Sequence, residues 1–185
     1  MPKANLIFSM SMSLDGFVKG PDGTFDWGVP TEEEHRVHNE RVGRLSAHLC
    51  GRALYETMRF WYTPEATNSE DPVIREFAAI WQALPKIVFS RTLTSVEGPN
   101  TRLATRDVEA ELAELDGDVE VGGAALAAEC ARRGLIDEYR PFVKPVLVGG
   151  GTPFLPPLDA RVDLRLLETR TFPDGAVYLR FARAV

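Results

Sequence analysis

The sequence predicts a single α/β domain built on a mixed, mostly parallel sheet. Three observations favour this class. Short apolar stretches of strand length alternate with segments of helical periodicity over residues 5–133. Near the C-terminus, residues 164–172 and 176–183 flank a Pro-Asp-Gly turn and predict an antiparallel hairpin. The length of 185 residues fits one domain over residues 1–185.

The expected helices carry start and stop signals. Thr31 and Glu34 match the two halves of a capping box. Asp71 and Pro72 supply an N-cap and a proline for the first turn of another helix, which Pro85 ends. The expected helices cover about residues 31–45, 52–58, 72–84, 108–115 and 124–133.

The expected strands are short and mostly apolar. Pro141 and Pro145 fall inside one of them and indicate an edge or a bulge. Between the second and third helices, the polar segment 64–70 is expected to be a mobile loop. The expected strands cover residues 5–12, 47–50, 86–90, 119–121, 138–148, 164–172 and 176–183.

Composition and charge narrow the possible functions. Apolar residues make up 44% of the chain, and 21 basic against 27 acidic residues give a net charge of −6. A nucleic-acid partner is not expected, because such proteins need an extended basic face. Cys50 and Cys130 lie in apolar surroundings, which favours free thiols in a reducing compartment. No membrane span or secretory signal is evident, so a cytoplasmic location is expected.

The candidate chemistry lies where expected strands run into helices or loops, since ligands of open α/β sheets bind beyond these strand ends. A tight glycine turn or solvated surface residues would explain each segment taken alone. Together, three phosphate-compatible ends on one sheet predict a dinucleotide site. The three segments are Gly122-Gly123-Ala124-Ala125, Gly51-Arg52 and Ser90-Arg91.

Other candidate sites are weaker. His35 and His38 lie on the first expected helix near Glu34 and could form a metal site. An exposed charged helix face explains them better. No third ligand is evident, so no metal is expected. No Gly-x-Ser-x-Gly nucleophile motif is present. The glycine run around Gly150 either lines a pocket or makes room for a crossing chain.

Six motifs, at residues 12–16, 51–56, 88–91, 121–123, 137–139 and 145–151, occur in an order that covers nearly the whole chain. In this order they resemble the dihydrofolate reductase-like superfamily. The resemblance is greatest to the reductase domain of riboflavin biosynthesis deaminase-reductases and its stand-alone relatives. The resemblance implies a three-layer fold around an eight-stranded mixed sheet, NADPH as the hydride donor, and a homodimer.

The resemblance also implies roles for individual residues. The cofactor-binding residues would be Gly51, Arg52, Ser90, Arg91, Gly122, Gly123, Ala124 and Ala125. Asp15 and Gly16 would shape the loop near the nicotinamide, and Asp15 is a candidate catalytic residue together with Glu32. Glu32 lies near the position of the catalytic carboxylate of dihydrofolate reductases; the alternative is a charge that stabilises the helix N-terminus. Trp27 and Trp61 are candidate walls of the substrate pocket, together with Gly16 and Gly150.

The residues expected to contact the substrate differ from the substrate-binding motifs of both families. Residues 83–86 lack the arginine with which dihydrofolate reductases bind the folate glutamate. Ser9 stands where the riboflavin enzymes carry a lysine, and residues 60–64 replace their Asp-Asp-Pro loop. The sequence therefore predicts an NADPH-dependent reductase that resembles 5-amino-6-(5-phosphoribosylamino)uracil reductase. The alternatives are a dihydrofolate reductase-like enzyme and a non-catalytic NADP-binding protein that kept the fold.

Overall fold

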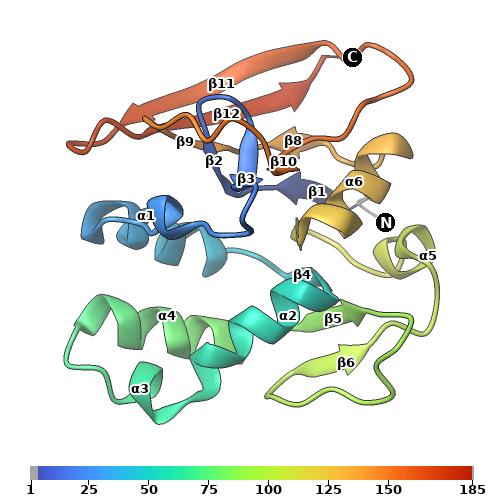
Figure 1. Ribbon diagram of the computed structural model, residues 1–185. Coiled ribbons are helices and arrows are strands. Elements are labelled where there is room, and N and C mark those ends of the chain that lie inside the picture. Colours follow the sequence, from blue (N-terminus) through green and yellow to red (C-terminus); the bar gives the residue numbers. More distant parts are fainter. Residues whose placement is uncertain (1–3, 185) are drawn as a thin grey trace.

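The computed structural model describes residues 4–184, which form one large sheet covered by helices on both faces (Figure 1). Its strand order is β2-β9-β12-β8-β1-β7-β4-β5-β6, and β11 pairs with β12. The strands are β1 (Asn5–Phe8), β2 (Ser11–Ser13), β4 (Ala47–Gly51), β5 (Lys86–Phe89), β6 (Thr101–Leu103), β7 (Asp118–Gly122), β8 (Glu138–Tyr139), β9 (Phe142–Lys144), β11 (Leu164–Thr171) and β12 (Val177–Arg183). A separate two-stranded sheet pairs β3 (Phe17–Lys19) with β10 (Thr152–Pro153).

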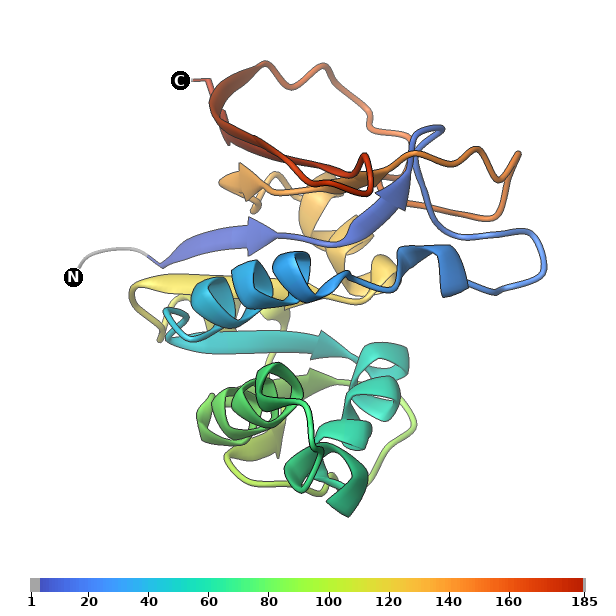
Figure 2. The ribbon, with the colours of Figure 1, turned by 90° about the vertical axis from the view of Figure 1, so that its left-hand side faces the viewer.

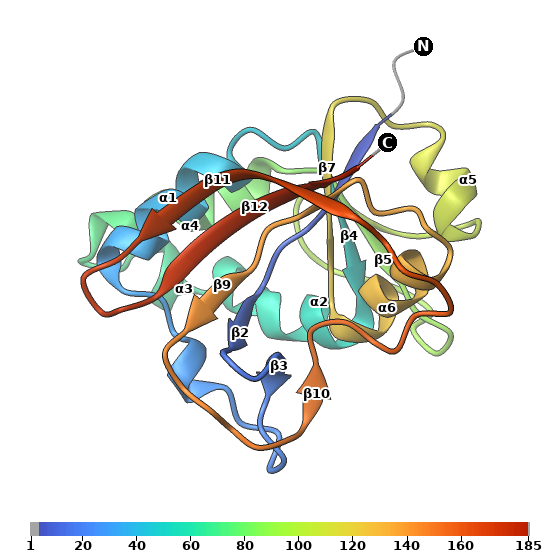
Figure 3. The same ribbon diagram turned by 90° about the horizontal axis from the view of Figure 1, so that it is seen from above.

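Pairing directions confirm the predicted class. β1, β4 and β7 run parallel to one another, as do β4, β5 and β6, and Figure 2 shows β1 and β4 pointing the same way. β12 is antiparallel to β8, β9 and β11, so the C-terminal hairpin adds the antiparallel part. This hairpin forms one edge of the molecule and lies nearest the viewer in Figure 3.

The helices are η1 (Asp26–Gly28), α1 (Glu32–Val42), α2 (Arg52–Met58), η2 (Arg59–Tyr62), α3 (Pro64–Thr67), α4 (Pro72–Ala83), α5 (Val108–Leu112) and α6 (Ala124–Arg132). Leu126 of α6 packs against Leu49 and Val121 on one face of the sheet. Trp81 of α4 packs with Cys50 on the opposite face. The central strands are therefore buried on both faces, which explains their continuous apolar character.

Two expected strands are each divided in the structure. The stretch 5–12 becomes β1 and β2, and the stretch 138–148 becomes β8 and β9. Pro141 lacks an N–H, and across the gap the Arg140 N–H donates to the Phe8 carbonyl and the Phe142 N–H to the Met10 carbonyl. The large sheet of the described chain has ten strand segments. If β1 with β2 and β8 with β9 are each counted as one strand, it has the eight strands that the resemblance implies.

Two local predictions were wrong. Residues 64–70 are not a loop throughout: Thr63 and Pro64 begin the short helix α3, and its Ala66 is fully buried. The helix expected to reach Leu45 ends at Val42, where Gly43 follows as the C-cap. Within residues 4–184, no helix combines the length and the apolar composition needed to span a lipid bilayer.

Candidate active site

The predicted cofactor residues meet at one edge of the sheet. β7, β4 and β5 are neighbours and run parallel, so their carboxyl ends lie side by side. The register pairs Cys50 with Gly122 and Gly51 with Phe89. The three segments that follow these strands are thereby brought together beyond the strand ends, where ligands of open α/β sheets are expected to bind.

Two glycines at this edge touch through their backbones. Gly123 has φ +95°, and a Cβ added there would lie 3.3 Å from Gly51 Cα. A Cβ on Gly122 would collide with Leu54. The turn therefore requires glycine for conformation and close packing. No side chain caps α6, whose first residues are Ala124 and Ala125, so its N-terminus offers N–H groups to an anion.

The polar residues at this edge are exposed, except for Ser90, which is half-buried. The Ser90 hydroxyl accepts hydrogen bonds from the N–H groups of Thr92 and Leu93, which fixes the turn after β5. Arg52 pairs with Glu56 at 2.7 Å on the surface of α2, and Arg91 is exposed beside them. These side chains surround the strand ends from the solvent side, where an incoming phosphate would meet them.

Asp15 ties two loops together. Its carboxylate accepts hydrogen bonds from the N–H groups of Val148, at 3.2 Å, and Gly149, at 2.7 Å. A hydrogen bond from Ser13 and these backbone donors lower the pKa of Asp15. Asp15 thus stays ionised at neutral pH and positions the glycine run that contains Gly150. This loop-joining contact was not foreseen from the sequence, because the two loops lie far apart in the chain.

Glu32 lies in the first turn of α1, largely exposed, where it forms a 2.6 Å ion pair with Arg36. Its catalytic role stays a prediction, and its position fits the alternative of a helix N-terminal charge. The buried carboxylate of this helix is instead Glu34, which accepts the Thr31 N–H and pairs with Lys144 at 2.6 Å.

A cavity of about 230 Å³ lies beside the strand ends, between the sheet and helices α1, α2 and α4. Trp61, predicted as a pocket wall, lines it; Trp27, Gly16 and Gly150 do not. Gly122 belongs both to this lining and to the glycine turn, so the cavity adjoins the candidate cofactor edge. The lining residues are Ser9, Met10, Pro30, His35, His38, Val42, His48, Leu54, Met58, Trp61, Phe77, Trp81, Glu120 and Gly122.

All three histidines of the chain line this cavity. The expectation that His35 and His38 form an exposed helix face was wrong. His35 is only 9% exposed and packs against Trp61 and Phe77, while His38 lies 4.3 Å from the Phe142 ring, centroid to centroid. Burial lowers the pKa of His35 and lowers that of His38 to about 3, so both are neutral at pH 7.

A buried polar network forms the floor of the cavity. Glu120 of β7 accepts a hydrogen bond from Arg41 at 3.0 Å and faces His48 of the adjacent strand β4. Cys50 lies 3.3 Å from His48 Nδ1. Sequence reasoning passed over these residues, although one polar residue inside an otherwise apolar parallel strand is a detectable signal. Within residues 4–184, no group of three His, Cys, Asp or Glu side chains is arranged to hold a metal ion.

Comparison with known proteins decides the family. Residues 4–178 match the RibD C-terminal domain. The chain belongs to this family. Two Bacillus subtilis (strain 168) proteins are similar along most of their length. YyaP is 28% identical, and the match covers 97% of this chain and 95% of YyaP. YwjB is 26% identical, and the match covers 96% of this chain and 97% of YwjB. Both carry the description "uncharacterized protein".

Solved structures show the same fold at low identity. A putative riboflavin biosynthesis protein from Shewanella sp. PV-4 superposes with a TM-score of 0.76 at 20% identity, covering 98% of this chain and 99% of that one. The deaminase/reductase of Thermotoga maritima gives 0.68 at 16% identity, with 98% of this chain but 57% of that one covered. Dihydrofolate reductase from Enterococcus faecalis, complexed with NADP(H), gives 0.62 at 16% identity, covering 98% and 97%. The fold is thus dihydrofolate reductase-like, within a family of reductase-like domains.

Proposed function

We propose that this protein is an NADPH-dependent reductase of a small planar substrate. The proposal rests on the position of Gly122, which belongs to both candidate sites. It ends β7 at the glycine turn, and it also lines the neighbouring cavity. A cofactor on the turn and a substrate in the cavity would therefore be adjacent, as hydride transfer requires. The structure of a dihydrofolate reductase with NADP(H) supports this cofactor for the fold.

The residues at the sheet edge fit a dinucleotide phosphate. The turn at Gly51 and Gly123 is a cradle that a Cβ would fill, and the N-terminus of α6 has no side-chain cap. These groups would hold the pyrophosphate, while Arg52, Ser90 and Arg91 would approach the outer phosphates. When bound, NADPH supplies the hydride. The protein's own part is to hold both partners at short distance and to exclude water with Trp61 and Phe77.

Reduction of a ribosylaminopyrimidine, as in riboflavin biosynthesis, is the activity that the family supports best. Folate reduction and simple NADP binding without turnover remain the alternatives. Ser9 and the Phe60–Pro64 region differ from the substrate side of the riboflavin enzymes, and Ser9 is engaged here, since its hydroxyl donates to the Arg140 carbonyl at 2.8 Å. Parallel assays of NADPH oxidation with the ribosylaminopyrimidine and with dihydrofolate separate these activities.

The cofactor is tested by titrating NADPH and NADH against intrinsic fluorescence. We expect a preference for NADPH that Arg91→Ala reduces about ten- to a hundredfold, because a charge-assisted contact to the 2′-phosphate contributes about 1.5–3 kcal/mol. Arg161→Ala is the control, since Arg161 is 85% exposed and, within residues 4–184, forms an ion pair only with Asp163. Equal affinities for the two cofactors, or an unchanged preference in Arg91→Ala, would contradict the proposal.

A further inference from the structure

The two ring nitrogens of His48 differ in their contacts: Nδ1 has a close partner, whereas Nε2 has no hydrogen bond within the described chain. His48 is 4% exposed in the middle of β4, and its Nδ1 lies 3.3 Å from Cys50 Sγ. Its Nε2 lies 3.7 Å from Glu120 Oε1, which is an ion-pair distance but too long for a hydrogen bond. Because His48 and Glu120 both line the cavity, this second nitrogen is positioned to meet a ligand there.

The surroundings of His48 favour its protonated form. Burial acts against the charge, but Cys50 on the same strand and Glu120 on β7 outweigh it and raise the pKa of His48. Arg41 of α1 is neutralised by Glu120 at 3.0 Å, and His38 of the same helix is neutral. The remaining neighbours are the Trp81 ring of α4, 5.1 Å away, and Lys86, which is opposite His48 in the register of β5.

The other ionisable and hydroxyl side chains of the lining are less able to donate. His35 and His38 are neutral at pH 7, and the hydroxyl of Ser9 already donates to the Arg140 carbonyl. Glu120 is a carboxylate whose Oε2 accepts from Arg41. Among these groups, His48 is therefore the strongest hydrogen-bond donor, because it alone donates from a charged ring.

The rest of the lining restricts the class of ligand. Trp61, Phe77 and Trp81 provide aromatic walls, and the volume of about 230 Å³ suits one or two fused rings. No lysine or arginine of the described chain lines the cavity. A phosphate group would thus find neither a permanent cation nor a bidentate partner inside it.

Resting on the proposed function, we propose that His48 binds the substrate by donating its Nε2–H to a carbonyl oxygen or ring nitrogen. The substrate is an uncharged planar heterocycle without a phosphate group, and it lies inside the cavity. This hydrogen bond polarises the C=O or C=N group next to the Gly122 wall. It would make the adjoining carbon more receptive to a hydride from bound NADPH, and protonated His48 would give its Nε2 proton to the oxygen or nitrogen, so that one hydride and one proton reduce the double bond. The family supports a ribosylaminopyrimidine as substrate, whereas the lining of this cavity favours a heterocycle without the phosphate; NADPH-dependent reduction is common to both.

The test uses phosphate-free lumazine and 6-aminouracil against uridine 5′-monophosphate, with quenching of tryptophan fluorescence as the signal. Two of the three tryptophans line the cavity, so occupancy is reported directly. We expect at least one base to bind, and the nucleotide to bind about tenfold more weakly or worse. His48→Phe keeps a flat ring without an N–H and should weaken base binding about tenfold, whereas His48→Gln keeps a donor and should retain most of it.

Glu114→Gln is the control, since Glu114 is exposed and does not line the cavity, and thermal melts establish that each variant folds. Base affinity should also fall as pH rises through the pKa of His48, and this dependence should be absent in His48→Gln. The inference is overturned if no base binds, if the nucleotide binds more tightly, or if folded His48→Phe binds like the wild type. An NADPH titration of the same samples tests the proposed function separately. NADPH binding without base binding would contradict only this inference. Base binding without NADPH binding would contradict only the proposed function.

Discussion

Gly123 shows how one residue serves both the fold and the candidate cofactor site. Its φ of +95° is strained for any L side chain, and a Cβ there would lie 3.3 Å from Gly51 Cα. If this turn binds a phosphate, as the three strand-end segments predict, a larger residue at Gly123 weakens cofactor binding. The backbone shows that stability must also suffer, so the two effects have to be measured separately.

We expect Gly123→Ala to lower the free energy of unfolding by about 2 kcal/mol or more, from backbone strain and close packing combined. NADPH affinity should fall as well, because the new methyl group occupies the cradle. Gly23→Ala is a matched control, since Gly23 has φ +81° and no atom within 4 Å of an added Cβ. Denaturant melts give stability, and NADPH is titrated at a temperature where both variants are folded. Normal NADPH affinity in folded Gly123→Ala would make this glycine a turn residue only.

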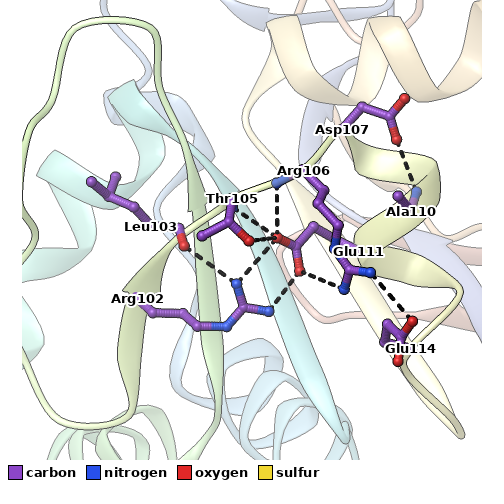
Figure 4. Close-up of polar contacts among 8 residues, drawn as sticks. All are labelled: Arg102, Leu103, Thr105, Arg106, Asp107, Ala110, Glu111 and Glu114. Carbon is purple, nitrogen blue, oxygen red and sulfur yellow. Dashed lines mark hydrogen bonds and ion pairs between the residues drawn. The ribbon is translucent and has the colours of Figure 1, made fainter.

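At the scale of elements, one buried carboxylate joins β6, α5 and the loop between them (Figure 4). Glu111 of α5 pairs with Arg102 of β6 at 2.6 Å and accepts the backbone N–H of Thr105 at 2.9 Å. Its side chain has no exposed surface. The hydrogen bond from Arg102 is the main cause that lowers the pKa of Glu111 to about 2, despite the opposing effect of burial.

The sign of the pH dependence follows from this lowered pKa. Unfolded Glu111 titrates near its ordinary pKa of 4.5, so its contribution to stability is complete above that pH and is lost as pH falls towards about 2. Glu111→Gln should cost about 2–3 kcal/mol at pH 7 and flatten the loss of stability between these two pH values. Glu114→Gln breaks only an exposed pair with Arg106 and should cost under about 1 kcal/mol. Urea melts from pH 2 to 7 measure both variants, and equal costs would contradict a structural role for Glu111.

At the scale of the molecule, the edge strand β11 is exposed along its whole length. Among the strands of the described chain it pairs only with β12. It carries Leu164, Leu166 and Leu167, which are 40%, 49% and 39% exposed. A long edge strand with exposed leucines is a common site of association. The homodimer implied by the family resemblance stays a prediction, and β11 is the surface on which we expect it to form.

We expect Leu166→Lys to convert the dimer into a monomer, because a charged side chain would be buried at the interface. Leu147→Lys is the control, as Leu147 is 70% exposed but lies outside β11. Light scattering coupled to size exclusion gives the mass of each variant. A monomeric wild type would exclude the dimer, and a dimeric Leu166→Lys would move the interface elsewhere.

Local signals were sufficient for most of the secondary structure. The capping box of Thr31 and Glu34 is present, and Asp71 caps α4 with Pro72 in its first turn, because capping depends on side chains within a few residues. The strand-to-helix junctions at Gly51 and Gly122 were also correctly located. From these, the fold class and the gathering of the candidate cofactor residues at one sheet edge could be predicted.

Tertiary structure alone decided which side chains meet across the molecule. Glu34 pairs with Lys144, 110 residues later, and His48 faces Glu120 because β4 and β7 are neighbours in the sheet. No local pattern encodes such pairs, since they depend on strand order and register. For the same reason the sequence favoured Glu32 by its position at a helix start, whereas packing exposed Glu32, buried Glu34 and enclosed three histidines around one cavity. The sequence by itself determined the elements and the glycine turn; the close packing of helices on the sheet determined the cavity and its chemistry.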